Sequence, residues 1–133
     1  MRRACMPLRV ARYRPVNEVF GLSEDIATLP VAEVAELLNQ PVSRVHQLVK
    51  DGQLLSFRRE GEVVVPSAFL GEDGAVIKGL AGTITVLRDG GYADPDILRW
   101  LFEEDDTLPG TPVASLRAGR HREVKRRAQA MAF

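Results

Sequence analysis

The most regular pattern of hydrophobic and polar positions in this chain lies between Leu29 and Pro66. Four apolar residues follow the i, i+3, i+4, i+7 spacing of one helix face, namely Val31, Val34, Ala35 and Leu38. Pro30 suits the first turn of this helix, where a missing N–H costs nothing. Asn39 and Pro41 interrupt the pattern, because Asn can end a helix in the left-handed conformation and Pro can begin the next helix.

A second helix is predicted from about Val42 to Asp51, and Gly52 ends it. Its expected buried face consists of Val42, Val45, Leu48 and Val49. The residues expected on the opposite side are Ser43, Gln47 and Lys50, with Arg44 and His46 on the flanks. A turn of about three residues is too short for a free linker, so the two helices must pack at a steep angle.

A β-hairpin is predicted directly after this helix pair. Its strands cover Leu54–Arg59 and Glu62–Val65, and Gly61 can take the positive φ that the turn demands. Ser67–Leu70 adds a helical turn. Two helices, a tight turn and a hairpin form the layout of a winged helix-turn-helix, which most often places one helix in a DNA groove.

Helical patterns also dominate the rest of the chain. Four glycines punctuate a connecting region, namely Gly71, Gly74, Gly79 and Gly82. Helices are predicted over about 83–88 and 95–103, with Asp94 as the N-cap of the second and Trp100 in the core. Thr111-Pro112 repeats this start signal and Gly119 the stop signal, and a last helix covers 120–132. The predicted fold is mainly α with a small β-hairpin wing: a basic, flexible arm over 1–27, a winged helix-turn-helix over 28–70 and a helical lobe over 71–133.

The 133 residues carry no formal net charge, but the charges are segregated. Both ends are rich in arginine, and the middle is acidic. In the last helix, Arg122, Lys125 and Arg126 are expected to face outward. They could contact phosphates, bind an acidic partner, or pair with the acidic run over 103–106.

Composition and motifs exclude several classes of protein. No apolar run is long enough to cross a membrane, and the arginine-rich N-terminus has no apolar segment of a signal peptide. The single cysteine, Cys5, favours a cytoplasmic protein. His46 and His121 have no second ligand at metal-binding spacing, and no phosphate loop or nucleophile motif is present. We expect no enzyme activity, no cofactor and no metal.

Six residues are candidate DNA contacts. Gln47 can hydrogen-bond adenine, and Arg44 can read guanine or hold a phosphate. Ser43 and Lys50 suit phosphate contacts, and Arg58 and Arg59 flank the tip of the wing. Arg122, Lys125 and Arg126 are candidate auxiliary phosphate contacts.

Residues 28–70 resemble the winged helix-turn-helix of excisionase and MerR type, in the run LPVAEVAELL followed by Val45, Leu48, Gly52 and Leu54. From residue 28 onward the chain resembles small actinobacterial DNA-binding proteins that are substrates of a membrane Ser/Thr protein kinase in mycobacteria. The blocks that carry this resemblance are AELLNQPVSRVHQLVKDGQLLSFRREGEVVVP, LRDGGYADPDILRWLF and REVKRRAQAMAF.

That resemblance implies DNA binding by the second helix and the wing, switched off by phosphorylation of a threonine in the N-terminal arm. No threonine precedes Thr28 here, and Ser23 is the sole earlier serine, so these two are the candidate phosphorylation sites. A phosphate there would repel DNA by its negative charge.

The sequence therefore predicts a protein that binds double-stranded DNA as a monomer or homodimer, in the role of a transcriptional regulator, with a Ser/Thr kinase as a second partner and no membrane contact. The alternative is a protein-interaction module of antitoxin or adaptor type that uses the C-terminal lobe. Residues 100–124 resemble the partner-binding domain of certain antitoxins, which supports this alternative.

Overall fold

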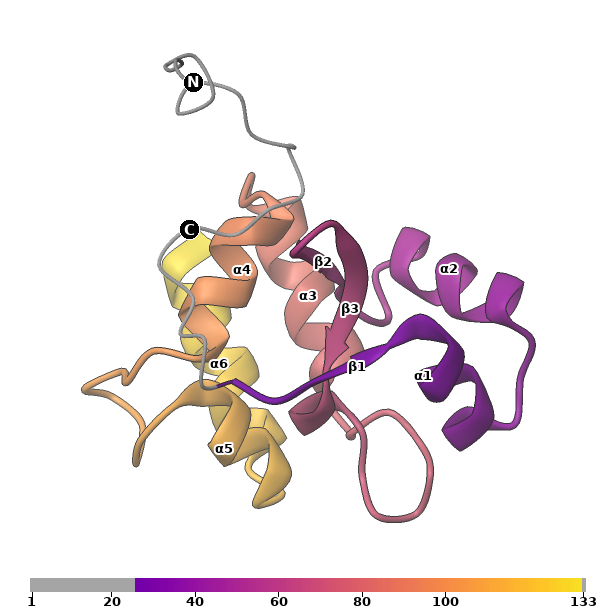
Figure 1. Ribbon diagram of the computed structural model, residues 1–133. Coiled ribbons are helices and arrows are strands. Elements are labelled where there is room, and N and C mark those ends of the chain that lie inside the picture. The colour runs from indigo at the N-terminus through magenta and orange to yellow at the C-terminus, as the bar shows by residue number, and fades with distance from the viewer. Residues whose placement is uncertain (1–25, 133) are drawn as a thin grey trace, which may run out of the picture.

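The computed structural model describes residues 26–132, so the predicted arm lies almost wholly outside the described residues (Figure 1). In chain order the elements are β1 (Thr28–Pro30), α1 (Val31–Leu38), α2 (Val42–Lys50), β2 (Phe57–Arg59), β3 (Glu62–Pro66), a 3₁₀ helix η2 (Ser67–Phe69), α3 (Leu80–Asp89), α4 (Asp94–Leu101), α5 (Pro112–Arg117) and α6 (His121–Ala132). The predicted class, mainly α with a small β wing and a helical C-terminal region, is confirmed.

A three-stranded antiparallel sheet carries the wing, in the order β1-β3-β2. The predicted turn is confirmed: Glu60 and Gly61 both have positive φ, at 52° and 81°, as a type I′ hairpin requires. The first predicted strand was too long, because Leu54 and Leu55 are buried but do not pair. Strand β1 was not predicted, and Thr28 of β1 lies opposite Pro66.

The helix pair follows the predicted pattern closely. Asn39 has a φ of 56° and ends α1 in the left-handed conformation. Pro30 precedes the first turn as the N-cap and last residue of β1. The expected burial of Val42 was wrong: its side chain is 43% exposed, whereas Val45 is fully buried. Val42 is the first residue of α2, where the chain leaves the turn, and no neighbouring element covers it.

The C-terminal helices have shifted starts. Helix α3 begins at Leu80, and Gly82 lies inside it rather than in the connecting region. Ala93, not Asp94, is the N-cap of α4, and the Asp94 carboxylate pairs with Arg88 instead. The predicted start at Thr111-Pro112 is confirmed, since the Thr111 hydroxyl accepts a hydrogen bond from the Ala114 N–H.

One continuous core joins the winged helix-turn-helix to these helices. Helix α3 is central and packs along α6, and Ile84 and Leu87 of α3 and Val124 and Ala128 of α6 are fully buried. The Phe69 ring meets the Phe102 ring at a centroid distance of 5.6 Å, which connects η2 to the end of α4. No helix within residues 26–132 is long and apolar enough to span a bilayer.

Asp105 ties the acidic loop to its surroundings. Its carboxylate accepts hydrogen bonds from Thr107 (Oγ1, 2.6 Å), Arg127 (Nε, 3.0 Å) and Trp100 (Nε1, 3.1 Å). These bonds, those from Thr107 first, hold the pKa of Asp105 well below its usual range. Trp100 is thus a half-buried donor at the edge of the core.

Candidate nucleic-acid interface

Helix α2 presents an uninterrupted exposed face. Val45 and Leu48 are buried against the rest of the domain, and the side chains opposite them point away from it. The exposed residues are Val42, Ser43, Arg44, His46, Gln47 and Lys50. The structure thus places all four predicted α2 contacts on one surface. It adds Val42 and His46, which form a neighbouring ridge at i, i+4 spacing.

The side chains of this face differ in how they are held. Gln47 Nε2 donates to Asp51 Oδ1 at 2.9 Å, which turns the amide along the helix. Arg44 and Lys50 form no ion pair with any described residue. The α2 face therefore offers one oriented amide and two cations that are available to a ligand.

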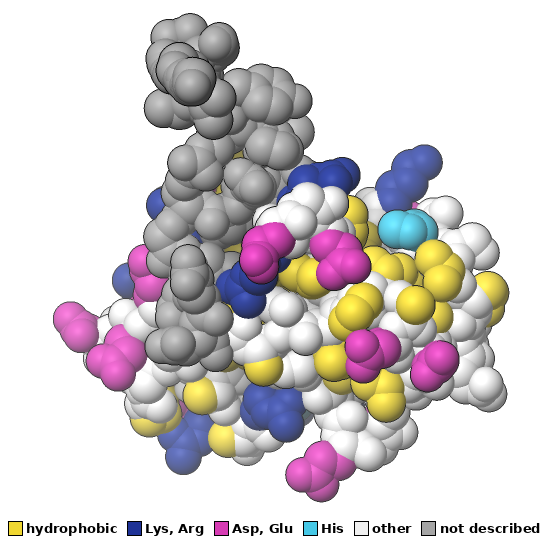
Figure 2. Space-filling model, viewed as in Figure 1, with side chains coloured by type: hydrophobic (Ala, Val, Ile, Leu, Met, Phe, Trp, Pro, Cys, Tyr) yellow, Lys and Arg dark blue, Asp and Glu magenta, His cyan; other side chains and the backbone are white. Residues whose placement is uncertain are grey.

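The wing tip lies beside α2 (Figure 1), and its arginines are already engaged. Arg58 Nη1 donates to the Gly61 carbonyl at 3.0 Å. Arg59 Nη1 donates to the Ile26 carbonyl at 2.9 Å, and its guanidinium lies 5.1 Å from the centre of the Phe57 ring. Glu60 and Glu62 are exposed on the same hairpin, and acidic and basic side chains lie close together in this region of Figure 2.

The last helix lies away from this surface. Arg122, Lys125 and Arg126 are exposed, as predicted, but α6 packs on α3 and lies on the other side of the molecule from α2 (Figure 1). The structure therefore brings the α2 and wing residues together and leaves the three α6 cations on a separate surface.

Arg88, in helix α3 of the C-terminal region, is hydrogen-bonded to the end of α2. Arg88 Nη2 donates to the Val49 carbonyl at 3.3 Å and Nη1 to the Lys50 carbonyl at 3.5 Å. Asp94 grips the same guanidinium with bonds of 2.9 and 2.7 Å, and this pairing raises the pKa of Arg88. Sequence reasoning missed this contact because its partners are 38 and 39 residues apart, and no local pattern points to it.

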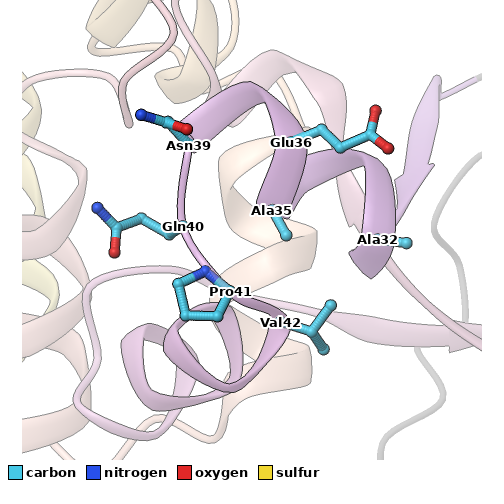
Figure 3. Close-up of a pocket in the computed structure, with 7 residues that line it drawn as sticks. All are labelled: Ala32, Ala35, Glu36, Asn39, Gln40, Pro41 and Val42. Atoms are coloured by element: carbon cyan, nitrogen blue, oxygen red, sulfur yellow. The ribbon is translucent and has the colours of Figure 1, made fainter.

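A shallow hollow lies at the turn between α1 and α2 (Figure 3). It is lined by Ala32, Ala35, Glu36, Asn39, Gln40, Pro41 and Val42. A single carboxylate and two amides among apolar side chains offer no catalytic arrangement. Within residues 26–132, no group of three or more His, Cys, Asp or Glu side chains could hold a metal ion.

The two candidate phosphorylation residues differ in setting. Ser23 lies outside the described residues. Thr28 is half-buried in β1, and the residue before it is hydrogen-bonded to the start of η2: the Ala27 carbonyl accepts from the Ser67 N–H at 3.0 Å. Ile26 and Ala27, the last two residues of the predicted arm, are thus hydrogen-bonded to β2 and η2.

A helix-turn-helix with an exposed second helix, followed by a three-stranded sheet whose hairpin lies beside that helix, defines a winged helix-turn-helix protein. Two family models match the chain: "DNA-binding protein Rv2175c, wHTH domain" over residues 15–70, and "Rv2175c C-terminal domain of unknown function" over residues 77–132. The chain belongs to the Rv2175c family, which is described as DNA-binding and not as a family of enzymes.

One relative and one solved structure give the extent of this similarity. The DNA-binding protein Rv2175c of Mycobacterium tuberculosis (strain ATCC 25618 / H37Rv) is 45% identical over 124 residues, which cover 84% of this chain and 85% of that protein. The NMR structure of Rv2175c has a TM-score of 0.78 at 44% identity, covering 85% of this chain and 86% of that one.

Proposed function

We propose that this protein binds double-stranded DNA by placing α2 in the major groove, with the β2–β3 wing on the adjacent backbone. The observation that carries the proposal is the α2 face: its side chains are exposed, and from Val42 to Lys50 the helix holds no carboxylate. An α-helix fits the width of the major groove, and the first residues of a recognition helix contact the base edges. The DNA-binding description of the Rv2175c family supports the same conclusion.

Each α2 side chain has a role that suits its chemistry. Gln47 reads a base edge, with adenine as the bidentate partner, and Arg44 reads guanine or holds a phosphate. Ser43 and Lys50 contact phosphates. Val42 is added as an apolar contact for a thymine methyl group because it is exposed at the first turn. His46, beside it, is a further candidate for a base edge.

The wing and the N-terminal residues supply backbone contacts. Arg58 and Arg59 lie beside the minor groove or the backbone, and residues 1–27 act as a basic arm on the DNA. In this division, residues 28–70 form the reading unit and residues 71–133 a lobe that supports it. The unit is of excisionase or MerR type.

A fluorescence anisotropy titration with random-sequence and selected duplexes tests DNA binding. Affinity should fall steeply as salt is raised, because neutralised phosphates release counterions. Absence of binding near 50 mM salt, where phosphate contacts are little screened, would refute the proposal.

Selection of bound sequences from a random pool tests the readout. Gln47→Ala should change the selected base at one position, whereas Gln53→Ala, an exposed glutamine outside α2, should leave the preference unchanged. The double change Arg58→Ala and Arg59→Ala should weaken binding to all sequences alike. An unchanged preference in Gln47→Ala would remove Gln47 from base reading.

The proposed biological role is transcriptional regulation, with binding reduced by Ser/Thr phosphorylation at Ser23 or Thr28. A phosphate adds a charge of about −1.5 to −2, and at Thr28 it would lie near the Arg59 contact with Ile26 and repel DNA. Treatment with a Ser/Thr kinase followed by mass spectrometry and a DNA titration tests this. The affinity of the wild type should fall, while that of the double variant Ser23→Ala, Thr28→Ala should not.

A further inference from the structure

The outward face of α6 is a compact group of cations. Arg122, Lys125 and Arg126 stand at i, i+3 and i+4 spacing and are all exposed, with Gln129 one turn further along the same side. The opposite side of α6 is buried against α3. Arg122 and Arg126 carry like charges at i, i+4 spacing, and the repulsion between them destabilises the free protein slightly.

Glu123 lies on the flank of this face, but no carboxylate of residues 26–132 forms an ion pair with Arg122, Lys125 or Arg126. Of the nearby acidic run over 103–106, Asp105 alone reaches α6, and it pairs with Arg127 at 3.0 Å. The other ion pairs found within residues 26–132 are Arg88–Asp94 and Arg99–Asp96. The three α6 cations are therefore available to an external anion.

This face cannot share a straight duplex with α2. Helices α2 and α6 lie on opposite sides of the molecule, with α3 between them (Figure 1). The α6 face points away from α3, and the α2 face points away from the domain core. A single duplex would have to bend around the protein to touch both, and bending DNA costs free energy.

We propose that the α6 face (Arg122, Lys125, Arg126 and Gln129) binds the phosphate backbone of a second DNA duplex, so that one chain bridges two duplexes. This inference rests on the proposed function of α2 for the first duplex. Arg, Lys and Gln side chains are the usual donors to phosphate oxygens. A protein partner is disfavoured because the α6 face lacks the apolar centre that protein–protein interfaces contain.

A two-colour retention assay with the full-length protein tests the bridge. One duplex is fixed to beads, the protein is added, and retention of a second, fluorescent duplex of the same sequence is measured. Three phosphate contacts give a salt slope of about −2.7, so doubling the salt should weaken the α6 contact with the second duplex about six-fold. The triple variant Arg122→Ala, Lys125→Ala, Arg126→Ala should bind the bead-bound duplex as the wild type does but lose at least nine-tenths of the second duplex.

The control is Lys78→Ala, which removes an exposed cation outside α2 and α6 and should leave retention unchanged. Retention that survives the triple change, or a triple variant that loses both duplexes in parallel, overturns the inference. Wild-type protein that binds the first duplex and never the second also overturns it and leaves the proposed function intact. Wild-type protein that binds neither duplex refutes the proposed function itself.

Discussion

Arg88 connects the C-terminal helices to the proposed recognition helix, and Arg88→Ala tests the importance of this connection. The guanidinium caps the Val49 and Lys50 carbonyls, which are among the last four carbonyls of α2 and have no intrahelical donor. A cation at a helix C-terminus also interacts favourably with the helix dipole. Removing the side chain leaves the Lys50 carbonyl and the Asp94 carboxylate without this partner, while the Val49 carbonyl keeps its bond from the Gly52 N–H at 3.2 Å.

The size of the effect follows from exposure. A cation at a helix C-terminus contributes about 0.3–1 kcal/mol near the surface, and an exposed ion pair about 0.2–1 kcal/mol. The Arg88 and Asp94 side chains are 29% and 38% exposed, so solvent screens both interactions. We expect Arg88→Ala to lower the free energy of unfolding by about 1 kcal/mol. If α2 must be reordered on binding, the same free energy corresponds to about a five-fold loss of DNA affinity.

Urea unfolding and a DNA titration over a range of salt concentrations measure the two effects. The salt slope should not change, because Arg88 orients α2 and does not itself contact phosphate. Asp94→Ala and Asp96→Ala form a matched pair, because each removes a carboxylate from the first turn of α4 that pairs with an arginine. Asp94 pairs with Arg88, which contacts α2, whereas Asp96 pairs with Arg99, for which no contact with α2 is found within residues 26–132. Equal DNA affinities for these two variants, or a shallower salt slope in Arg88→Ala, would refute the reasoning.

Three further changes test the packing. Asp105→Asn should lower the free energy of unfolding by about 2 kcal/mol at pH 7, whereas the change at exposed Asp106, Asp106→Asn, should have almost no effect. The pKa of Asp105 in the folded protein lies below the unfolded value of about 3.9. The difference between the two variants, measured by urea unfolding, should therefore shrink as the pH falls below about 4. Gly79→Ala and Gly91→Ala both place a Cβ on a residue with positive φ, of 91° and 93°, but a Cβ at Gly79 would also meet the His121 side chain at the start of α6 at 2.3 Å. Thermal unfolding of Gly79→Ala should therefore show a loss of stability about 1–3 kcal/mol larger than that of Gly91→Ala. Equal losses would contradict the close packing of the start of α3 against α6. Val42→Ala should cost under about 0.5 kcal/mol in urea, and a larger loss would contradict its exposure.

The elements that the sequence predicts well are those with local signals. The 3.6-residue periodicity determines α1 and α2, Asn39 marks the end of α1, and Glu60-Gly61 marks the hairpin turn. These signals involve residues within a few positions of one another, so they survive without knowledge of the fold. The same holds for the start of α5, where Thr111 caps the helix with its own side chain.

What could not be predicted depends on distant contacts. Strand β1 is three residues long, which is too short to show the alternation of apolar and polar residues that marks a strand. It forms because Leu29 pairs with Val65, far along the chain. Val42 follows the apolar spacing of α2, and its exposure depends on how much of α2 the neighbouring elements cover. The Arg88 contact with the end of α2 likewise requires the C-terminal helices to be in place. For the candidate interface, sequence therefore indicated the helix and wing but not what holds them or which side α6 faces.

The charges of the wing limit how strongly this interface can bind DNA without regard to sequence. Arg58 and Arg59 share the hairpin with Glu60 and Glu62, so the wing has no net charge. Together with the two cations of α2, at most four phosphates can be neutralised on this side, and the salt slope from these residues should not exceed about 3.6 in magnitude. Attraction to arbitrary DNA is correspondingly modest, so discrimination must come from base contacts of the α2 face. A steeper salt dependence for this duplex would then come from the arginines of residues 1–14, because the α6 cations lie on a separate surface and contact a second duplex in the proposed bridge.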